Sequence, residues 1–279
     1  VSETHIEKLE SLEGVLEEKL DLLRGLPDDG EAIVGDEPSL LSERARRLRR
    51  GLLVVGLGAR ADAAHRADNA SQDEHGYWSF VWRGEPVRLR VPGRVSVQNA
   101  LLALTVAELV GVPAAEAVRG VGQVEAGSMR GEIKRIGGLT LIVDCYNANP
   151  QSVRAALDLL LDIEPGRPKV AVLGSMLELG GRSEELHTAL LDEAAALGLD
   201  LLVATGGFAR AAADTRSAES DFWISVEDPL EAYEALRGRL AGDEVLLLKA
   251  SRGVALERLI PLLKNDFGGA TPAPEELEA

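Results

Sequence analysis

From about Gly127 onward, short apolar runs alternate with segments that have helical spacing. This alternation is typical of α/β folds, in which parallel strands form a sheet and the helices between them cover both faces. In such a sheet, ligands bind beyond the carboxyl ends of the strands. The predicted strands are "TLIVD", "KVAVLG", "DLLVATG", "FWIS" and "EVLLLKAS", and the predicted helices lie near residues 152–163, 183–197, 208–215, 228–240 and 254–264.

Polar segments follow these strands, and the richest of them is "DCYNANPQSV", Asp144–Val153. A carboxylate such as Asp144 can accept hydrogen bonds from a ribose, a ring such as Tyr146 can pack against a purine, and the amides of Asn147 and Asn149 can donate and accept. A polar turn that caps the next helix, with Pro150 in its first turn, explains the stretch equally well. The residues alone leave both interpretations open. The other segments are Ser175 to Glu178, Thr205 with Gly206, and Lys249 to Arg252.

Before Gly127 the pattern differs, which predicts a second structural unit in a chain of 279 residues. Apolar residues at three- and four-residue spacing from Ser11 to Leu23 predict an amphipathic helix with Ser11 as its N-cap. Residues 77–91 predict an antiparallel hairpin with its aromatic side chains in the core. We also expect short strands in "EAIVGDEP" and "GLLVVGLG", a solvated basic helix in "SERARRLRR", and helices in "SVQNALLALTVAELVGV" and "PAAEAVRGVGQV".

Charge and composition exclude several classes of protein. The net charge of -16 argues against nonspecific binding to nucleic acid or anionic lipid. No apolar run approaches the roughly 18 residues of a membrane span, and one cysteine cannot form an internal disulfide, so we expect a cytoplasmic protein. The sequence contains neither a Cys/His metal motif nor a G-x-x-x-x-G-K-[ST] phosphate loop. Because it begins without methionine or a signal segment, we expect a piece of a longer protein.

The stretch at Asp144 resembles a motif of the Mur ligase family, and most closely the D-x-Y-N-A-N-P-x-S motif of its MurF branch, which adds D-alanyl-D-alanine. Further segments resemble that branch in the same order, across about residues 2–264. The Y-N-A-N-P string distinguishes this branch from other Mur ligases. The matching segments are "THIEKLESLEGVLEEKLDLL", "PGRVSVQNALLAL", "SMRGEI", "VLGSMLELG" and "LLKASRGVALE".

The resemblance implies the C-terminal part of a Mur-ligase central ATPase domain followed by a complete Rossmann-like C-terminal ligase domain. We expect the partial ATP-binding domain, without its phosphate loop, over residues 1–126, the Rossmann-like domain over 127–266 and a disordered tail over 267–279. The family's UDP-sugar domain and G-K-[ST] loop would lie upstream of Val1. We therefore expect the chain as given to be inactive alone.

The activity implied by the resemblance is ATP-dependent amide ligation in peptidoglycan precursor synthesis. ATP would phosphorylate the carboxylate of UDP-N-acetylmuramoyl-tripeptide to an acyl phosphate, which the amine of D-alanyl-D-alanine then attacks. The implied cofactors are ATP and Mg²⁺. We expect a cytoplasmic monomer that binds no nucleic acid and does not insert into membranes.

The resemblance also implies roles for single residues. His5 and a carbamylated, metal-bridging Lys19 would bind Mg²⁺, although Lys19 also fits a surface ion pair. Arg130 would reach the γ-phosphate, with a linker ion pair as its alternative. Lys19 and Arg130 are thus the predicted catalytic residues. The predicted ATP-binding residues are Asn99, Arg130, Asp144 and Tyr146, and the predicted substrate-binding residues are Asn147, Asn149, Lys249, Ser251 and Arg252.

Some positions depart from the family pattern or have a simpler explanation. Val95 and Ser175 replace a histidine and an aspartate of the family. His187 fits packing or capping better than catalysis, Cys145 fits a small buried filler, and Lys249 also fits a structural ion pair. The alternatives to MurF-type ligation are another amino-acid ligase of the superfamily, of the cyanophycin or folylpolyglutamate synthetase type, and a non-catalytic binding remnant. The Y-N-A-N-P string weighs against the first.

Overall fold

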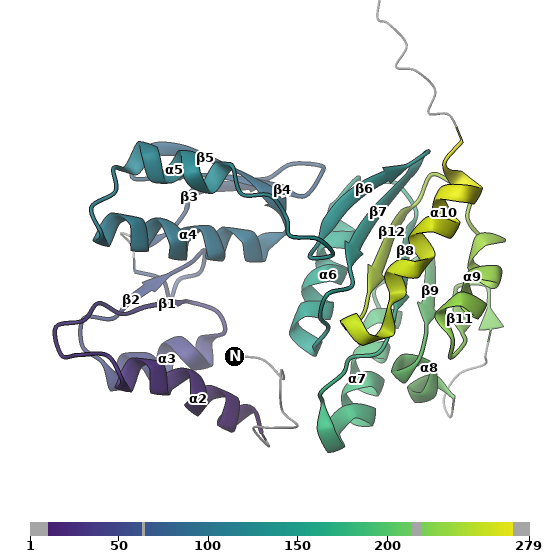
Figure 1. Ribbon diagram of the computed structural model, residues 1–279, viewed down its shortest axis with the longest axis horizontal. Coiled ribbons are helices and arrows are strands. Elements are labelled where there is room, and N and C mark those ends of the chain that lie inside the picture. Colours follow the sequence, from purple (N-terminus) through teal and green to yellow (C-terminus); the bar gives the residue numbers. More distant parts are fainter. Residues whose placement is uncertain (1–10, 63–64, 214–218, 270–279) are drawn as a thin grey trace, which may run out of the picture.

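A computed structural model describes residues 11–62, 65–213 and 219–269. They form two α/β parts, and the linker between them is residues 123–131 (Figure 1). The first part contains two small sheets with helices packed on them. Its elements are α2 (Leu12–Arg24), β1 (Ile33–Gly35), α3 (Ser39–Leu48), β2 (Leu53–Val55), β3 (Asp68–Gln72), β4 (Tyr77–Trp82), β5 (Glu85–Pro92), α4 (Arg94–Leu109) and α5 (Ala114–Gly122).

The second part is one sheet in the order β10-β11-β9-β8-β12-β7-β6. The five inner strands are parallel, whereas β6 and β10 run antiparallel at its two margins. Its strands are β6 (Glu132–Ile136), β7 (Leu139–Asp144), β8 (Lys169–Leu173), β9 (Leu201–Ala204), β10 (Glu219–Ser220), β11 (Trp223–Ser225) and β12 (Val245–Lys249). Its helices are α6 (Pro150–Asp162), η2 (Gly180–Arg182), α7 (Ser183–Ala195), α8 (Gly207–Ala212), α9 (Pro229–Arg237), η3 (Arg252–Val254), η4 (Leu256–Arg258) and α10 (Leu259–Phe267).

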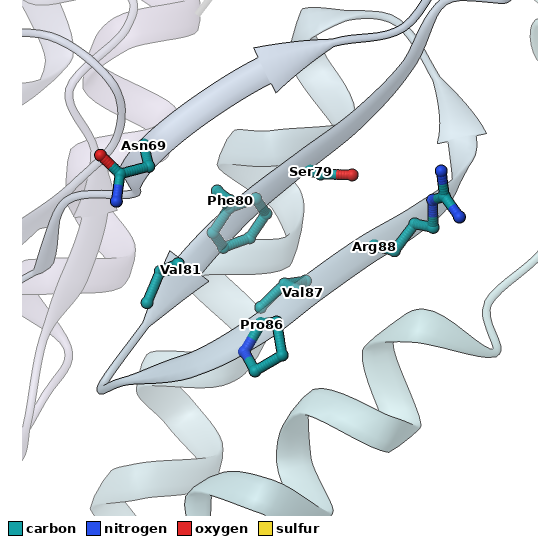
Figure 2. Close-up of a pocket in the computed structure, with 7 residues that line it drawn as sticks. All are labelled: Asn69, Ser79, Phe80, Val81, Pro86, Val87 and Arg88. Atoms are coloured by element: carbon teal, nitrogen blue, oxygen red, sulfur yellow. The ribbon is translucent and has the colours of Figure 1, made fainter.

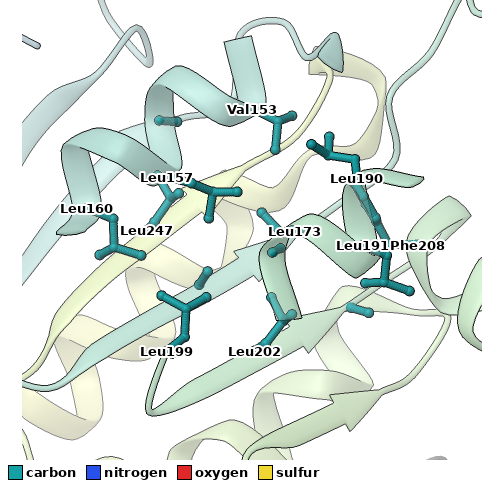
Figure 3. Packing of buried hydrophobic residues seen from close by; sticks show 14 of the residues in the cluster. Val153, Leu157, Leu160, Leu173, Leu190, Leu191, Leu199, Leu202, Phe208 and Leu247 are labelled. Atoms are coloured by element: carbon teal, nitrogen blue, oxygen red, sulfur yellow. The ribbon is translucent and has the colours of Figure 1, made fainter. Parts of the chain in front are cut away.

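Helices cover both faces of this sheet, as the sequence predicts. Successive strand side chains point to opposite faces, so Leu247 packs on one side while Leu246 and Leu248 pack on the other. Helices α6, α7 and α8 bury their apolar residues against the first face (Figure 3), and α9 and α10 against the second. The predicted fold class is confirmed, and the strands read as continuous apolar runs because both faces are buried.

The first part also follows the sequence pattern. Ser11 caps α2, because its Oγ accepts a hydrogen bond from the Gly14 amide at 3.1 Å. The predicted hairpin is the β4–β5 pair, and its Phe80 and Trp82 are buried beneath α4 and α5. β1 and β2 pair in parallel, and α3 supplies the crossover connection that parallel neighbours need.

One predicted helix is displaced, and three strands, β3, β6 and the two-residue β10, are not among the predicted ones. The helix expected at 254–264 begins only at Leu259, because Ala255 adopts a left-handed conformation with φ of 55° between two 3₁₀ turns. β3 and β6 were missed because "DNASQ" and "EIKRI" lack the continuous apolar pattern of the buried strands. Each pairs along one side only with a longer strand, so tertiary context and not local sequence determines it.

The two parts touch away from the linker. The turn between β3 and β4, Asp73–Gly76, which we call the docking turn, packs against the end of α6. The amide of Glu164 donates to the carbonyl of Glu74 at 2.7 Å. The Glu164 carboxylate is in turn bound by Arg135, Arg167 and the Thr140 hydroxyl. Within the described residues, no helix is both long and apolar enough to cross a bilayer.

Candidate functional site

The polar segments predicted from the sequence meet at the carboxyl ends of neighbouring strands. In the sheet, Lys249 lies beside Asp144 on one side and Leu173 on the other. The loops that follow β7, β8 and β12 therefore begin side by side. We call the residues Asp144–Asn149, Ser175–Glu178 and Lys249–Arg252 the strand-end cluster.

Lys249 joins the β7 loop to β12. Its Nζ donates to Asp144 Oδ2 and to the Asn147 carbonyl oxygen, both at 2.7 Å. The Lys249 side chain is 1% exposed, and the Asp144 side chain 21%. The ammonium therefore faces the protein, while part of the Asp144 carboxylate remains accessible.

Ser251 ties three loops together. Its Oγ donates to the Ala148 carbonyl at 3.4 Å and accepts from the Leu177 amide at 3.0 Å, while its own amide donates to the Ser175 carbonyl at 3.1 Å. Ser251 is buried. It therefore links the loops after β7, β8 and β12.

Ser175, for which the resemblance implies an aspartate in the family, bonds within the protein. Its Oγ accepts from the Gly207 amide at 2.7 Å. At Gly206, whose φ is 54°, a Cβ would lie 2.4 Å from this same oxygen. The short serine side chain and the two glycines therefore form a close backbone contact at the start of α8.

Arg130 and Tyr146 form a stacked pair at the exposed side of the cluster. The Arg130 guanidinium carbon lies 3.6 Å from the centroid of the Tyr146 ring, a cation–π contact. The Tyr146 amide donates to the Met129 carbonyl at 3.1 Å, which anchors the linker to the β7 loop. Tyr146 is 45% exposed, so this contact leaves ring surface accessible.

Asn149 caps α6. Its side-chain oxygen accepts from the Ser152 amide at 2.9 Å, and the Ser152 hydroxyl accepts from the Asn149 amide at 3.0 Å, which completes a capping box. Pro150 occupies the first turn of the helix, as predicted. Asn147, by contrast, has an exposed side chain. Both interpretations of "DCYNANPQSV" thus find support, a cap at Asn149 and outward polar groups before it.

Arg252 lies where the linker meets the last loop. Its Nη1 contacts Glu257 Oε1 at 2.9 Å and Met129 Sδ at 2.8 Å, and its side chain is 56% exposed. Sequence reasoning assigned no role to Met129 or Glu257. Glu257 could have been found, because it ends the matched "LLKASRGVALE" segment, whereas nothing in the sequence marks Met129.

His187 and Cys145 are buried, in agreement with their predicted packing roles. The Met176 amide donates to His187 Nε2 at 3.0 Å, so Nδ1 carries the proton and donates to the Ser183 carbonyl at 2.7 Å. Burial lowers the pKa of His187, and the Ser183 hydrogen bond opposes this only in part. Burial also raises the pKa of Cys145 to about 12, with smaller contributions from Glu257 and Asp144.

The predicted residues of the first part stand apart from these contacts. Lys19 lies exposed on α2, and Asn99 lies exposed on α4. His5 lies outside the described residues. Among those that are described, no group of three or more His, Cys, Asp or Glu side chains is arranged to hold a metal ion. Lys19 as an amine is a cation and fits a Mg²⁺ site only as its carbamate.

The first part also carries an open groove that belongs to no predicted site. It has a volume of about 410 Å³ and lies on the β3–β5 sheet (Figure 2). Arg88 is its one charged lining residue, and the strand-end cluster contributes nothing to it. The groove is lined by Asn69, Ser79, Phe80, Val81, Pro86, Val87 and Arg88.

Comparisons with known proteins agree with this architecture. The family model "Mur ligase middle domain" matches residues 1–107, and "Mur ligase, glutamate ligase domain" matches residues 129–252. The UDP-N-acetylmuramoyl-tripeptide D-alanyl-D-alanine ligase of Bacillus subtilis is 30% identical over 266 residues, which cover 93% of this chain and 57% of that protein. The ligase of the same name from Treponema pallidum is 36% identical over 188 residues, 67% of this chain and 40% of that protein.

Solved structures give the same result. MurF from Acinetobacter baumannii superimposes with a TM-score of 0.81 at 27% identity, over 95% of this chain and 58% of that one. The fold of MurF from Thermotoga maritima, solved in complex with ADP, matches with a TM-score of 0.79 at 22% identity, over 96% of this chain and 60% of that one. The chain thus spans a little over half the length of these structures and of the Bacillus subtilis relative.

Proposed function

Because the chain belongs to the Mur ligase family, with middle-domain and C-terminal-domain sequence in that order, we propose that it forms part of a MurF-type ligase. This enzyme joins D-alanyl-D-alanine to UDP-N-acetylmuramoyl-tripeptide, the two compounds that the names of its relatives give for them, and uses ATP to do so. The observation that carries the proposal is the strand-end cluster, in which the "DCYNANP" loop places an accessible carboxylate, an aromatic ring and an outward amide together. We divide the chain at residues 1–126 and 127–266, with 267–279 as a tail.

ATP binds on the side of the cluster that faces the linker. Asp144 accepts hydrogen bonds from the ribose, and Tyr146 packs against the adenine. Arg130 stabilises charge on the transferring phosphoryl group, for which its planar guanidinium is suited. Asn99 contacts the nucleotide from α4. The accessible part of the Asp144 carboxylate and the exposed Tyr146 ring support these roles.

The dipeptide binds on the other side of the same loop. Asn147 and Asn149 contribute amide groups, and Lys249, Ser251 and Arg252 complete the site from the end of β12. Arg252 has the exposed cationic side chain of this group, which suits it to the dipeptide carboxylate. The tripeptide carboxylate becomes an acyl phosphate, and the dipeptide amine displaces the phosphate from it.

His5 and a carbamylated Lys19 would hold Mg²⁺, which would supply positive charge beside the phosphates. The 279 residues contain no phosphate loop, so we propose that this chain alone does not turn over ATP. The enzyme acts as a monomer in the cytoplasm, and neither nucleic acid nor a membrane is a partner.

The test uses the full product of the gene that encodes this chain. Release of ADP should require both the UDP-linked tripeptide and D-alanyl-D-alanine. Arg130→Ala should lower kcat about 100-fold or more, because it removes a cation directed at transition-state charge. Arg83→Ala is the matched control, since Arg83 also lies over an aromatic ring, Trp82, but in the β4–β5 turn. An unchanged kcat in Arg130→Ala would reject the assigned role.

A further inference from the structure

Lys249 is buried, and its ammonium donates to Asp144 and to the Asn147 main chain. Its ammonium has three donors, and two of them reach Asp144 Oδ2 and the Asn147 carbonyl oxygen at 2.7 Å each. With 1% of its side chain exposed, Lys249 presents almost no surface to a ligand. To bind the dipeptide carboxylate directly, Lys249 would have to reach it with its third donor from a side chain that is almost fully covered.

Ser251 holds the next residue of the β7 loop in the same way. Lys249 holds the carbonyl of Asn147, and Ser251 Oγ donates to the carbonyl of Ala148 at 3.4 Å. Two successive carbonyl groups of the β7 loop are therefore directed towards the end of β12. The Asn147 side chain is exposed, on the accessible surface of the loop.

Stability alone does not explain a lysine at this position. Removing a cation from water costs free energy that a buried ion pair often fails to recover, and apolar side chains can replace such pairs without loss. A hydrogen-bonded ammonium can, however, fix two acceptors of different kinds at once. Here the acceptors are a carboxylate at the end of β7 and a main-chain carbonyl three residues later.

We propose that Lys249 is a positioning residue that sets Asp144 and the Asn147–Ala148 backbone with one ammonium and contacts neither ligand. It thereby couples the nucleotide side of the loop to the dipeptide side. The proposal rests on the function proposed above and specifies how Lys249 serves that site. Ser251 assists by holding the next carbonyl.

The first experiment needs no ligand. Hydrogen exchange is measured on the Lys249→Met protein and on the milder Lys249→Gln protein. The glutamine variant keeps a hydrogen-bond donor, and it serves as the test if Lys249→Met folds poorly. Lys169→Met is the matched control, because Lys169 is also buried and also bonds main-chain carbonyls, those of Ile163 and Glu164, but at the opposite ends of the strands.

We expect exchange in peptides covering residues 145–149 to rise at least about tenfold in the Lys249 variants and not in Lys169→Met, since local opening is governed by local contacts. Equal exchange of this loop in the Lys249 variants and the control would overturn the proposal. This readout is independent of whether the protein ligates any acceptor.

The second experiment separates positioning from direct contact. The full gene product and its Lys249→Met variant are assayed with D-alanyl-D-alanine and with D-alanyl-D-alaninamide, which lacks the terminal carboxylate. If Lys249 is a positioning residue, the substitution should lower kcat/KM about 100-fold with either acceptor. The loss from the substitution and the loss from removing the acceptor carboxylate should then multiply. The KM for ATP should also rise, because Asp144 is no longer held.

Direct contact predicts the opposite pattern. If the variant loses activity with the dipeptide but not with its amide, Lys249 binds the carboxylate and the proposal is wrong. An unchanged KM for ATP would also overturn the proposal, because Lys249 would then not act on the nucleotide through Asp144. If the parent protein ligates neither acceptor, the proposed function fails, and the hydrogen-exchange result still decides the positioning role.

Discussion

His187, which accepts a hydrogen bond from the strand-end cluster, shows what a buried polar residue beside that cluster contributes. Its imidazole is neutral, with Nε2 accepting from Met176 and Nδ1 donating to Ser183, and it packs edge-on against Phe208 at 4.8 Å. At Gly207, a Cβ would lie 2.5 Å from its Nε2. The histidine therefore holds the β8 loop against α8.

Protonation of His187 should weaken the fold. Because burial lowers its pKa in the folded state, the unfolded chain takes up the proton first as the pH falls below the ordinary value of 6.5. The stabilising contribution of neutral His187 is complete above that pH and is lost as the pH falls towards the folded-state pKa. The unfolding free energy of the wild type relative to His187→Gln should decrease on acidification by up to about 1.4 kcal/mol per pH unit.

Urea denaturation at a series of pH values measures this difference. His75→Gln is the matched control, because the His75 side chain is 51% exposed and it accounts for the general effect of losing a histidine. A constant difference between wild type and His187→Gln from pH 7.5 to pH 5 would mean that His187 is not held neutral.

For single residues, the sequence predicted which polar segments lie together but not the directions in which their side chains point. The polar segments at Asp144, Ser175 and Lys249 meet as expected, because carboxyl ends of parallel strands share one side of a sheet. The inward direction of Lys249 and Ser251 depends on the loop backbone they hold, which local sequence does not encode. Cys145, predicted to be buried, donates to the Leu248 carbonyl at 3.4 Å.

Among the elements, α6 connects the fold most directly to the site, because its cap is a candidate ligand residue. Asn149→Ala should lower the unfolding free energy by about 1 kcal/mol, whereas Asn149→Asp should retain the cap. The aspartate variant loses the amide donors, so it should raise the KM for D-alanyl-D-alanine while leaving stability near that of the wild type.

Chemical denaturation and steady-state kinetics check the two parts of this prediction. Asp228→Ala provides the matched control, since Asp228 caps α9 by accepting from the Leu230 amide at 2.7 Å on the other face of the sheet. It should cost similar stability without affecting the KM for the dipeptide. An unaltered KM in Asn149→Asp would confine Asn149 to capping.

Elements were predictable where burial imposes a simple period. The inner strands and the β4–β5 hairpin follow from apolar runs and alternation. Ser11 caps α2 and Pro150 lies in the first turn of α6, as predicted. β3 and β6 could not be predicted from their own side chains, because pairing with β4 and β7 makes them strands. The late start of α10 follows from the left-handed residue Ala255, a position where glycine would have been the usual signal.

On the scale of the whole molecule, the docking turn fixes how the two parts meet. Gly76 has φ of +84°, and a Cβ there would lie 2.7 Å from Ile163 Cγ2 and 2.8 Å from Leu159 Cδ1, both on buried side chains. Gly76→Ala should therefore separate the docking turn from α6 and speed hydrogen exchange at the Glu164 amide.

Gly84→Ala is the control for backbone strain. Gly84 has a similar φ of +81° but nothing within 4 Å of a Cβ. Both variants should lose about 1 kcal/mol or more of stability from the left-handed conformation, but only Gly76→Ala should alter exchange at Glu164. If the two variants exchange alike at Glu164, the turn does not hold the parts together.

The proposed D-alanyl-D-alanine-adding activity is tested most directly by the product that the full protein forms. The measurement is mass spectrometry of the product formed by the full gene product from ATP, Mg²⁺, UDP-N-acetylmuramoyl-tripeptide and a choice of acceptors: D-alanyl-D-alanine, D-glutamate or L-aspartate. We expect a UDP-linked pentapeptide to form with D-alanyl-D-alanine and no product to form with either single amino acid. A folded protein that joins a single amino acid in preference to the dipeptide, or that forms no amide at all, would contradict it.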